Sequence, residues 1–106
     1  MISLEYKELT PQEAKINLNK NLDILLVDVR EVGEYNMGHI EGAELIPLGE
    51  VEDTFEEMDI KKEQTIYVYC RSGHRSGIAQ EVLMDMGFTD VYNIGGVMQW
   101  PYELIQ

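Results

Sequence analysis

The sequence predicts a three-layer α/β domain with a largely parallel sheet. Three observations support this prediction: strand-like and helix-like segments alternate along the chain, residues 23–29 form a continuous apolar run bounded by acids, and glycines or prolines separate several of the segments. A continuous apolar run is typical of a strand buried on both faces, as in a parallel sheet. The 106 residues contain no internal repeat, low-complexity stretch or linker, so we expect a single domain over residues 1–106.

The elements of the first half follow from capping residues, apolar runs and turn signals. Thr10 and Glu13 form a capping box with Pro11 at the first helical position, which predicts a helix over residues 11–18. The other elements expected here are a short strand at 2–4, the buried strand at 23–29, one or two helical turns at 30–36, a turn-rich link at 38–42, and a short strand at 44–46 that Pro47 ends.

The second half shows the same alternation. Six acids occupy residues 50–59 together with Val51, Phe55 and Met58 at i, i+4 and i+7, which predicts an amphipathic helix. Its acidic side is either a solvated face, which we favour, or a docking surface. The remaining elements are a strand at 65–69, a helix at 76–86 with Gly87 as its stop, a strand at 91–93, and a terminal helical piece that follows Gly95 and Gly96 and holds Trp100.

Charge and composition exclude several classes of partner. The formal net charge of −12 argues against nucleic acids and anionic membrane surfaces. No apolar run approaches the roughly 20 residues of a membrane helix, and the N-terminal residues do not resemble a signal peptide. The single cysteine cannot form an internal disulfide. We therefore expect a protein of the reducing cytoplasm.

The only cysteine, Cys70, marks the candidate site. It is predicted to lie where the strand at 65–69 meets a glycine-containing loop, which is the edge where parallel sheets bind ligands. An ordinary thiol has a pKa of about 8.5, but loop amides and the start of the next helix favour the thiolate. Cys70 is thus a candidate nucleophile rather than an inert core thiol.

The residues after Cys70 suit an anionic ligand. Two of the three arginines of this acidic protein, Arg71 and Arg75, lie in the loop, and Gly73 permits the tight backbone turn that a cradle of amides needs. Ser76 either caps the following helix or turns its hydroxyl into the loop. His74 is either an exposed loop residue or a catalytic one. Trp100, farther along the chain, is assigned to core packing in preference to substrate contact.

Four motifs, in this order, resemble those of single-domain rhodaneses, a family of sulfurtransferases. They span most of the chain: VDVRE with EY (27–31 and 34–35), GHIEGA followed by IP (38–43 and 46–47), YCRSGHRS (69–76), and GG with a tryptophan (95–96 and 100). The resemblance implies a parallel five-stranded sheet flanked by helices and a ping-pong reaction that needs neither a metal nor an organic cofactor.

In the implied reaction, Cys70 takes a sulfur atom from a small anionic donor such as thiosulfate and becomes a persulfide. An acceptor, cyanide or a thiol, then removes that sulfur. A protein of a sulfur relay is a further candidate partner, and a non-catalytic or relay module is the alternative function.

The site roles follow from the chemistry of each residue. Cys70 is the expected nucleophile, and the main-chain amides of residues 71–76 are expected to stabilise the persulfide anion. Arg75 is the best candidate to bind the donor oxygens through its planar fork. The substrate-binding set is Arg71, Ser72, Gly73, His74, Arg75 and Ser76.

Asp28 and Arg30, which end the neighbouring strand, are expected from the resemblance to support the active-site loop. For Arg30, a salt bridge unrelated to catalysis is an equally good hypothesis. His39 is expected to fix a turn.

Related phosphatases of the same fold carry Cys-x5-Arg, whereas the spacing here is Cys-x4-Arg, a shorter loop that favours sulfur over phosphate. A phosphatase is therefore only the second candidate enzyme.

Overall fold

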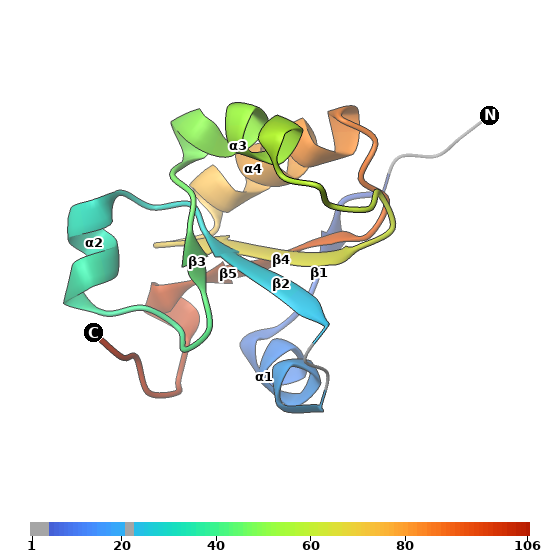
Figure 1. Cartoon of the computed structure of the whole chain (residues 1–106). Helices are drawn as coiled ribbons and strands as arrows, with labels where there is room; N and C mark the ends of the chain where they lie inside the picture. The colour runs from blue at the N-terminus through green and yellow to red at the C-terminus, as the bar shows by residue number, and fades with distance from the viewer. Residues whose placement is uncertain (1–4, 21–22) are drawn as a thin grey trace.

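Five parallel strands form the central layer of the computed structural model, which describes residues 5–20 and 23–106 (Figure 1). Their order across the sheet is β1-β5-β4-β2-β3, and each neighbouring pair is parallel. This confirms the α/β class and the five strands that the resemblance implies. The strands are β1 (Lys7–Glu8), β2 (Ile24–Asp28), β3 (Glu44–Leu45), β4 (Thr65–Cys70) and β5 (Val91–Gly96).

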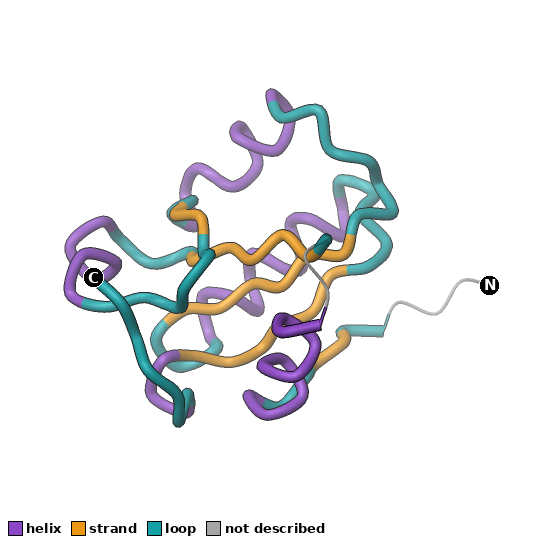
Figure 2. The backbone as a smooth tube through the Cα atoms, turned by 60° about the horizontal axis from the view of Figure 1, so that its bottom comes forward, coloured by secondary structure: helices purple, strands orange, loops and turns teal. Residues whose placement is uncertain are grey.

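Helices cover both faces of the sheet, as the figures show. In Figure 1, α3 and α4 lie above the sheet and α1 lies below it, while α2 stands at the end where β2 leaves the sheet. Figure 2 shows the strands side by side as the middle layer. The helices are α1 (Pro11–Lys20), α2 (Val32–Met37), α3 (Val51–Glu57) and α4 (His74–Asp85), with single 3-10 turns η1 (Leu48–Glu50) and η2 (Val97–Gln99).

The side chains of β4 alternate between two hydrophobic clusters. Ile66, Val68 and Cys70 belong to the cluster under α3 and α4, whereas Tyr67 and Tyr69 belong to the cluster under α1. Successive residues of a strand point to opposite faces, so this alternation follows from the pleat. It directs the Cys70 side chain toward α4, whose first turn comes directly after the loop.

Several predicted boundaries change in the structure. The strand expected at 2–4 lies outside the described residues, and the first described strand is Lys7–Glu8. The helix expected at 76–86 begins two residues earlier, at His74, because Gly73 takes the left-handed conformation that starts it (φ 104°). The terminal helical piece is a single 3-10 turn that ends just before Trp100.

The last strand is longer than predicted. Instead of ending at Asn93, β5 continues through Gly95 and Gly96, and Gly96 pairs with Cys70 after an irregularity in the β4–β5 register. This extension brings the glycine pair against the loop that follows Cys70. Within the described part of the chain, we find no helix with the length and apolar character to cross a bilayer.

Candidate active site

Cys70 is the last residue of β4, and its sulfur is enclosed. The residue is only 1% exposed, and the following loop folds back so that the Gly73 N–H donates to Sγ at 3.0 Å. The Ser76 hydroxyl lies 3.5 Å from the same sulfur. The loop after β4 therefore forms a cradle of donors around the thiol. This cradle consists of residues 70–76.

The cradle favours the thiolate form of Cys70. Burial raises the pKa of the thiol, but hydrogen bonds from the Ser76 hydroxyl and from the main-chain amides of Ser76, Gly73 and Ser72 together hold the pKa below its ordinary value. Hydrogen bonds to a charged form stabilise it. These donors lie around the N-terminus of α4, where the helix dipole is positive. The donors around Sγ therefore favour ionisation of a thiol that burial alone would keep protonated.

Ser76 is buried, and its hydroxyl turns into the cradle instead of capping the helix, which settles the alternative that the sequence left open. Its closest acceptor is Oδ1 of Asn93, at 2.8 Å, and the Gly95 carbonyl oxygen lies 3.4 Å away. A hydroxyl has one proton to donate. Cys70 Sγ and Asn93 Oδ1 therefore compete for the same donor.

Asn93 of β5 connects three parts of the site. Its Nδ2 donates to the Gly73 carbonyl oxygen at 3.0 Å, and its Oδ1 accepts from the Gly95 N–H at 3.0 Å as well as from Ser76. No role for Asn93 was predicted from the sequence. The contact with the amide two residues later is an Asx turn, and Asn-x-Gly at the end of a strand is the signal that indicates it.

Gly96 supplies the space that the cradle occupies. A Cβ atom at this position would overlap the Arg71 carbonyl group and the Ser72 nitrogen, so no larger residue fits without moving the loop. The Met98 N–H donates to the Arg71 carbonyl oxygen at 3.1 Å and fixes the same stretch. Gly96, the last residue of β5, therefore shapes the cradle from outside.

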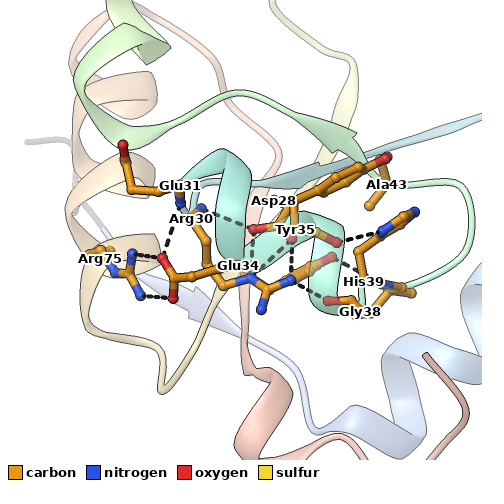
Figure 3. A network of polar contacts seen from close by, with 11 residues as sticks. Asp28, Arg30, Glu31, Glu34, Tyr35, Gly38, His39, Ala43 and Arg75 are labelled. Carbon is orange, nitrogen blue, oxygen red and sulfur yellow. Dashed lines mark hydrogen bonds and ion pairs between the residues drawn. The ribbon is translucent and has the colours of Figure 1, made fainter. Parts of the chain in front are cut away.

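Arg75 does not extend freely into solvent. Its two terminal nitrogens donate to the two carboxylate oxygens of Glu34 at 2.7 and 2.9 Å, which joins α4 to α2 (Figure 3). The Arg75 contact is the main cause that lowers the pKa of Glu34 to about 2. Glu34 belongs to the first of the four sequence motifs, but no role was predicted for it. Its capping-box position three residues after Glu31 was the available signal.

Asp28 and Arg30 form a buried ion pair beside the cradle. Arg30 Nη2 lies 2.8 Å from Asp28 Oδ2, and Nε contacts both carboxylate oxygens. Nη2 also donates to the Gly38 carbonyl oxygen at 2.7 Å, at the end of α2 (Figure 3). The pair thus ties the end of β2 to the helix that carries Glu34.

The other residues singled out from the sequence are dispersed around this site. Arg71 and His74 are exposed on the cradle. His39 is buried, stacks on the Tyr35 ring at 3.7 Å and contacts the Tyr35 carbonyl oxygen through Nδ1, so it does fix the turn after α2. Trp100 is 8% exposed and packs in the core cluster under α1, as expected.

The acidic face of α3 is solvated. Val51 and Phe55 are buried against the core, whereas the acids Glu52, Asp53, Glu56 and Glu57 are exposed. Metal ligands do not gather in the described ranges 5–20 and 23–106, where no group of three or more His, Cys, Asp or Glu side chains could hold a metal ion.

Comparison with known proteins points to one family. The family model described as "Rhodanese-like domain" matches residues 10–102. Over 71 residues, the chain is 42% identical to thiosulfate sulfurtransferase PspE of Escherichia coli, covering 67% of this chain and 68% of that protein.

Two further matches extend the likeness. The chain is 41% identical over 87 residues to the putative sulfur carrier protein YrkF of Bacillus subtilis, covering 81% of this chain but only 45% of that protein. The solved structure of a rhodanese-like domain protein from Staphylococcus aureus superposes with a TM-score of 0.82 at 34% identity, covering 93% of this chain and 96% of that one.

Proposed function

Because this chain belongs to the rhodanese-like domain family, whose members include sulfurtransferases, we propose that it transfers sulfane sulfur through a persulfide on Cys70. The observation that supports this proposal most directly is the environment of the sulfur. The Gly73 N–H donates to Sγ at 3.0 Å, and the donors around the thiol hold its pKa below the ordinary value. A buried thiol with no such donors would stay protonated and inert.

The first half of the reaction loads the enzyme. The Cys70 thiolate attacks the outer sulfur of thiosulfate and forms a new S–S bond. The S–S bond of the donor breaks, and sulfite leaves with its electron pair. The product is a Cys70 persulfide whose terminal sulfur carries the negative charge, and the cradle amides stabilise that anion as an oxyanion hole stabilises developing oxygen charge.

The second half regenerates the thiolate. Cyanide or a thiolate attacks the terminal sulfur of the persulfide, and the Cys70 thiolate is the leaving group. The same cradle donors that hold the resting thiolate receive it again. Covalent catalysis of this kind divides one difficult transfer into two easier ones, and it uses no metal or organic cofactor.

Arg75 and Arg71 are the proposed contacts for the donor's oxygens. The guanidinium of Arg75 forms parallel hydrogen bonds with two carboxylate oxygens, and the same fork suits the oxygens of a thiosulfonate. Arg71 is exposed on the cradle and attracts the anion toward it. A cytoplasmic setting suits this chemistry, because a lone thiol that cycles through a persulfide persists in a reducing compartment.

A second candidate function is a sulfur relay in which the persulfide passes to a protein. The similarity to YrkF, a putative sulfur carrier protein, favours it. The exposed acids on α3 would be its docking face. The two candidates share the loading step and differ in the acceptor.

Intact-protein mass spectrometry after incubation with thiosulfate tests the loading step. We expect one added sulfur, about 32 Da, that cyanide or dithiothreitol removes and that Cys70→Ser does not acquire. Absence of the adduct would overturn the proposal, and hydrolysis of an aryl phosphate without the adduct would assign the site to a phosphatase. A loaded protein that transfers sulfur to a partner protein but turns over slowly with cyanide would favour the relay.

A further inference from the structure

The fork of Arg75 is already occupied in the resting site. Its two terminal nitrogens bind the two carboxylate oxygens of Glu34 at 2.7 and 2.9 Å, which is the bidentate contact that an oxygen-bearing donor would make (Figure 3). A donor must therefore displace Glu34 from Arg75 or bind beside a neutralised pair. In both cases the carboxylate opposes an incoming anion.

Glu34 keeps its place without Arg75. The Glu31 N–H donates to Glu34 Oε1 at 3.1 Å in the capping box that begins α2. The end of α2 is fixed in turn by the contact from Arg30 to the Gly38 carbonyl oxygen. The carboxylate is thus positioned by its own helix, and its negative charge remains beside the site when Arg75 turns to a substrate.

The charges around Cys70 leave little attraction for an anion. Both Glu34 and the Cys70 thiolate raise the pKa of Arg75, so the guanidinium lies within electrostatic reach of the sulfur. Asp28 and Arg30 neutralise each other. In the part of the chain that the structure describes, Arg71 is the cradle arginine that forms no ion pair. The molecule as a whole carries −12.

We propose that Glu34 is a specificity-determining residue that makes the site discriminate against doubly charged donors in favour of singly charged ones. The inference rests on the proposed sulfur transfer and names its substrate class. The energy between a fixed charge and an approaching ion is proportional to the charge of the ion. A carboxylate therefore opposes a thiosulfate dianion with twice the energy with which it opposes a monoanionic thiosulfonate.

Glu34→Gln removes the charge and keeps the shape. The glutamine oxygen still accepts from the Glu31 N–H, since Gln also serves at the third position of a capping box. Glu31→Gln is the matched control. It changes the net charge by the same amount at the N-cap of the same helix. Glu31 is an exposed acid that influences Arg75 through space without forming an ion pair with it.

The test measures the loading of Cys70 with three reagents that differ in charge. Neutral iodoacetamide reports the reactivity of the thiolate itself and normalises the other rates. Methanethiosulfonate is the monoanion, which donates its outer sulfur and releases methanesulfinate, and thiosulfate is the dianion, which releases sulfite. Mass spectrometry of the intact protein follows each product against time.

After normalisation, Glu34→Gln should increase the rate of loading with both donors. The gain with the dianion should be the square of the gain with the monoanion. A gain of about threefold with methanethiosulfonate should accompany a gain of about tenfold with thiosulfate, since doubling the energy squares the factor. Salt near 1 M, where the Debye length is about 3 Å, should reduce the difference between the donors. Glu31→Gln should give smaller gains with both donors.

Equal gains with the two donors, no gain, or the same gains in Glu31→Gln would overturn the inference while leaving sulfur transfer intact. Glu34→Ala removes the charge together with the capping contact. It must also give a larger rate gain with thiosulfate than with methanethiosulfonate, as Glu34→Gln does. A wild-type protein that reacts with iodoacetamide but takes sulfur from neither donor would instead overturn the proposed function, and the inference with it.

Discussion

The side-chain amide of Asn93 donates to the carbonyl oxygen of Gly73 at 3.0 Å, so a residue of β5 holds the turn from which α4 begins. The oxygen of the same side chain accepts from the Ser76 hydroxyl at 2.8 Å. The Gly73 N–H also donates to the Cys70 sulfur at 3.0 Å, and the Ser76 hydroxyl lies 3.5 Å from that sulfur. The reactivity of the thiol therefore depends on a side chain that does not contact it.

Asn93→Asp should lower the reactivity of Cys70 at neutral pH. A carboxylate cannot donate to the Gly73 carbonyl oxygen, and its negative charge opposes the thiolate nearby. We expect the pKa of the thiol to rise and alkylation by iodoacetamide at pH 7 to slow about tenfold, with the pH profile moved to higher pH. Asn19→Asp, an exposed site on α1, adds the same charge away from the cradle and is the control. An unchanged profile in Asn93→Asp would show that Asn93 is not needed.

Ser76→Ala tests the hydroxyl itself. The wild-type thiol has a lowered pKa, so its reactivity should persist as the pH falls below the ordinary pKa of a thiol and be lost only at the lower folded-state value. Without the hydroxyl, the loss of reactivity should begin at higher pH. The wild type and Ser76→Ala should react equally at a pH where the Cys70 thiol of both proteins is ionised. Ser72→Ala is the comparison, because Ser72 faces the sulfur through its main-chain amide, and its shift should be smaller. Equal shifts of the pH profile in Ser76→Ala and Ser72→Ala would contradict the role of the Ser76 hydroxyl in stabilising the thiolate.

The fold and the position of Cys70 were predictable because they depend on local patterns. A continuous apolar run indicates a parallel strand, and a cysteine at the end of such a strand lies at the ligand-binding edge. The Gly73 turn and the start of α4 also follow from neighbouring residues, to within two positions. These features need little information from distant parts of the chain.

The roles of Asn93 and Glu34 were not predicted, because their contacts join segments that are distant in the sequence. Asn93 meets the cradle because of the β4–β5 register, which shifts between Val68 and Cys70 so that Cys70 pairs with Gly96. Glu34 meets Arg75 across 41 residues of sequence. A pattern in one segment contains no information about such a register or such a partner.

Gly96→Ala should distort the cradle. A methyl group at this position would overlap the Arg71 carbonyl group, and the nearest atoms are main chain and cannot rotate away. We expect a loss of about 1–3 kcal/mol in the free energy of unfolding, measured with denaturant, and slower loading of Cys70. Gly33→Ala is the matched control, since a Cβ there has no atom within 4 Å and alanine favours the helix. Full stability and reactivity in Gly96→Ala would contradict the steric argument.

The ion pair between Glu34 and Arg75 should make stability depend on pH in acid. Folding lowers the pKa of Glu34 from 4.5 to about 2, so the carboxylate contributes stability above pH 4.5 and loses it as the pH falls toward 2. Both side chains are about one-third exposed, which limits the contribution to at most about 1 kcal/mol. The difference in unfolding free energy between wild type and Glu34→Gln should therefore shrink from pH 6 to pH 3. A difference that stays constant would mean that the charge does not stabilise the fold.

Arg30→Met should be among the most destabilising changes in the chain. Asp28 is fully buried, and without Arg30 its carboxylate would be left as an unpaired charge in the core. Removing one partner of a buried pair costs about 3–5 kcal/mol, which denaturant unfolding would detect. The variant that combines Arg30→Met with Asp28→Asn should recover part of the loss, because the remaining side chain is neutral. If the double variant were no more stable than Arg30→Met alone, the loss would come from the Gly38 contact and from packing, and the charge of Asp28 would not be its cause.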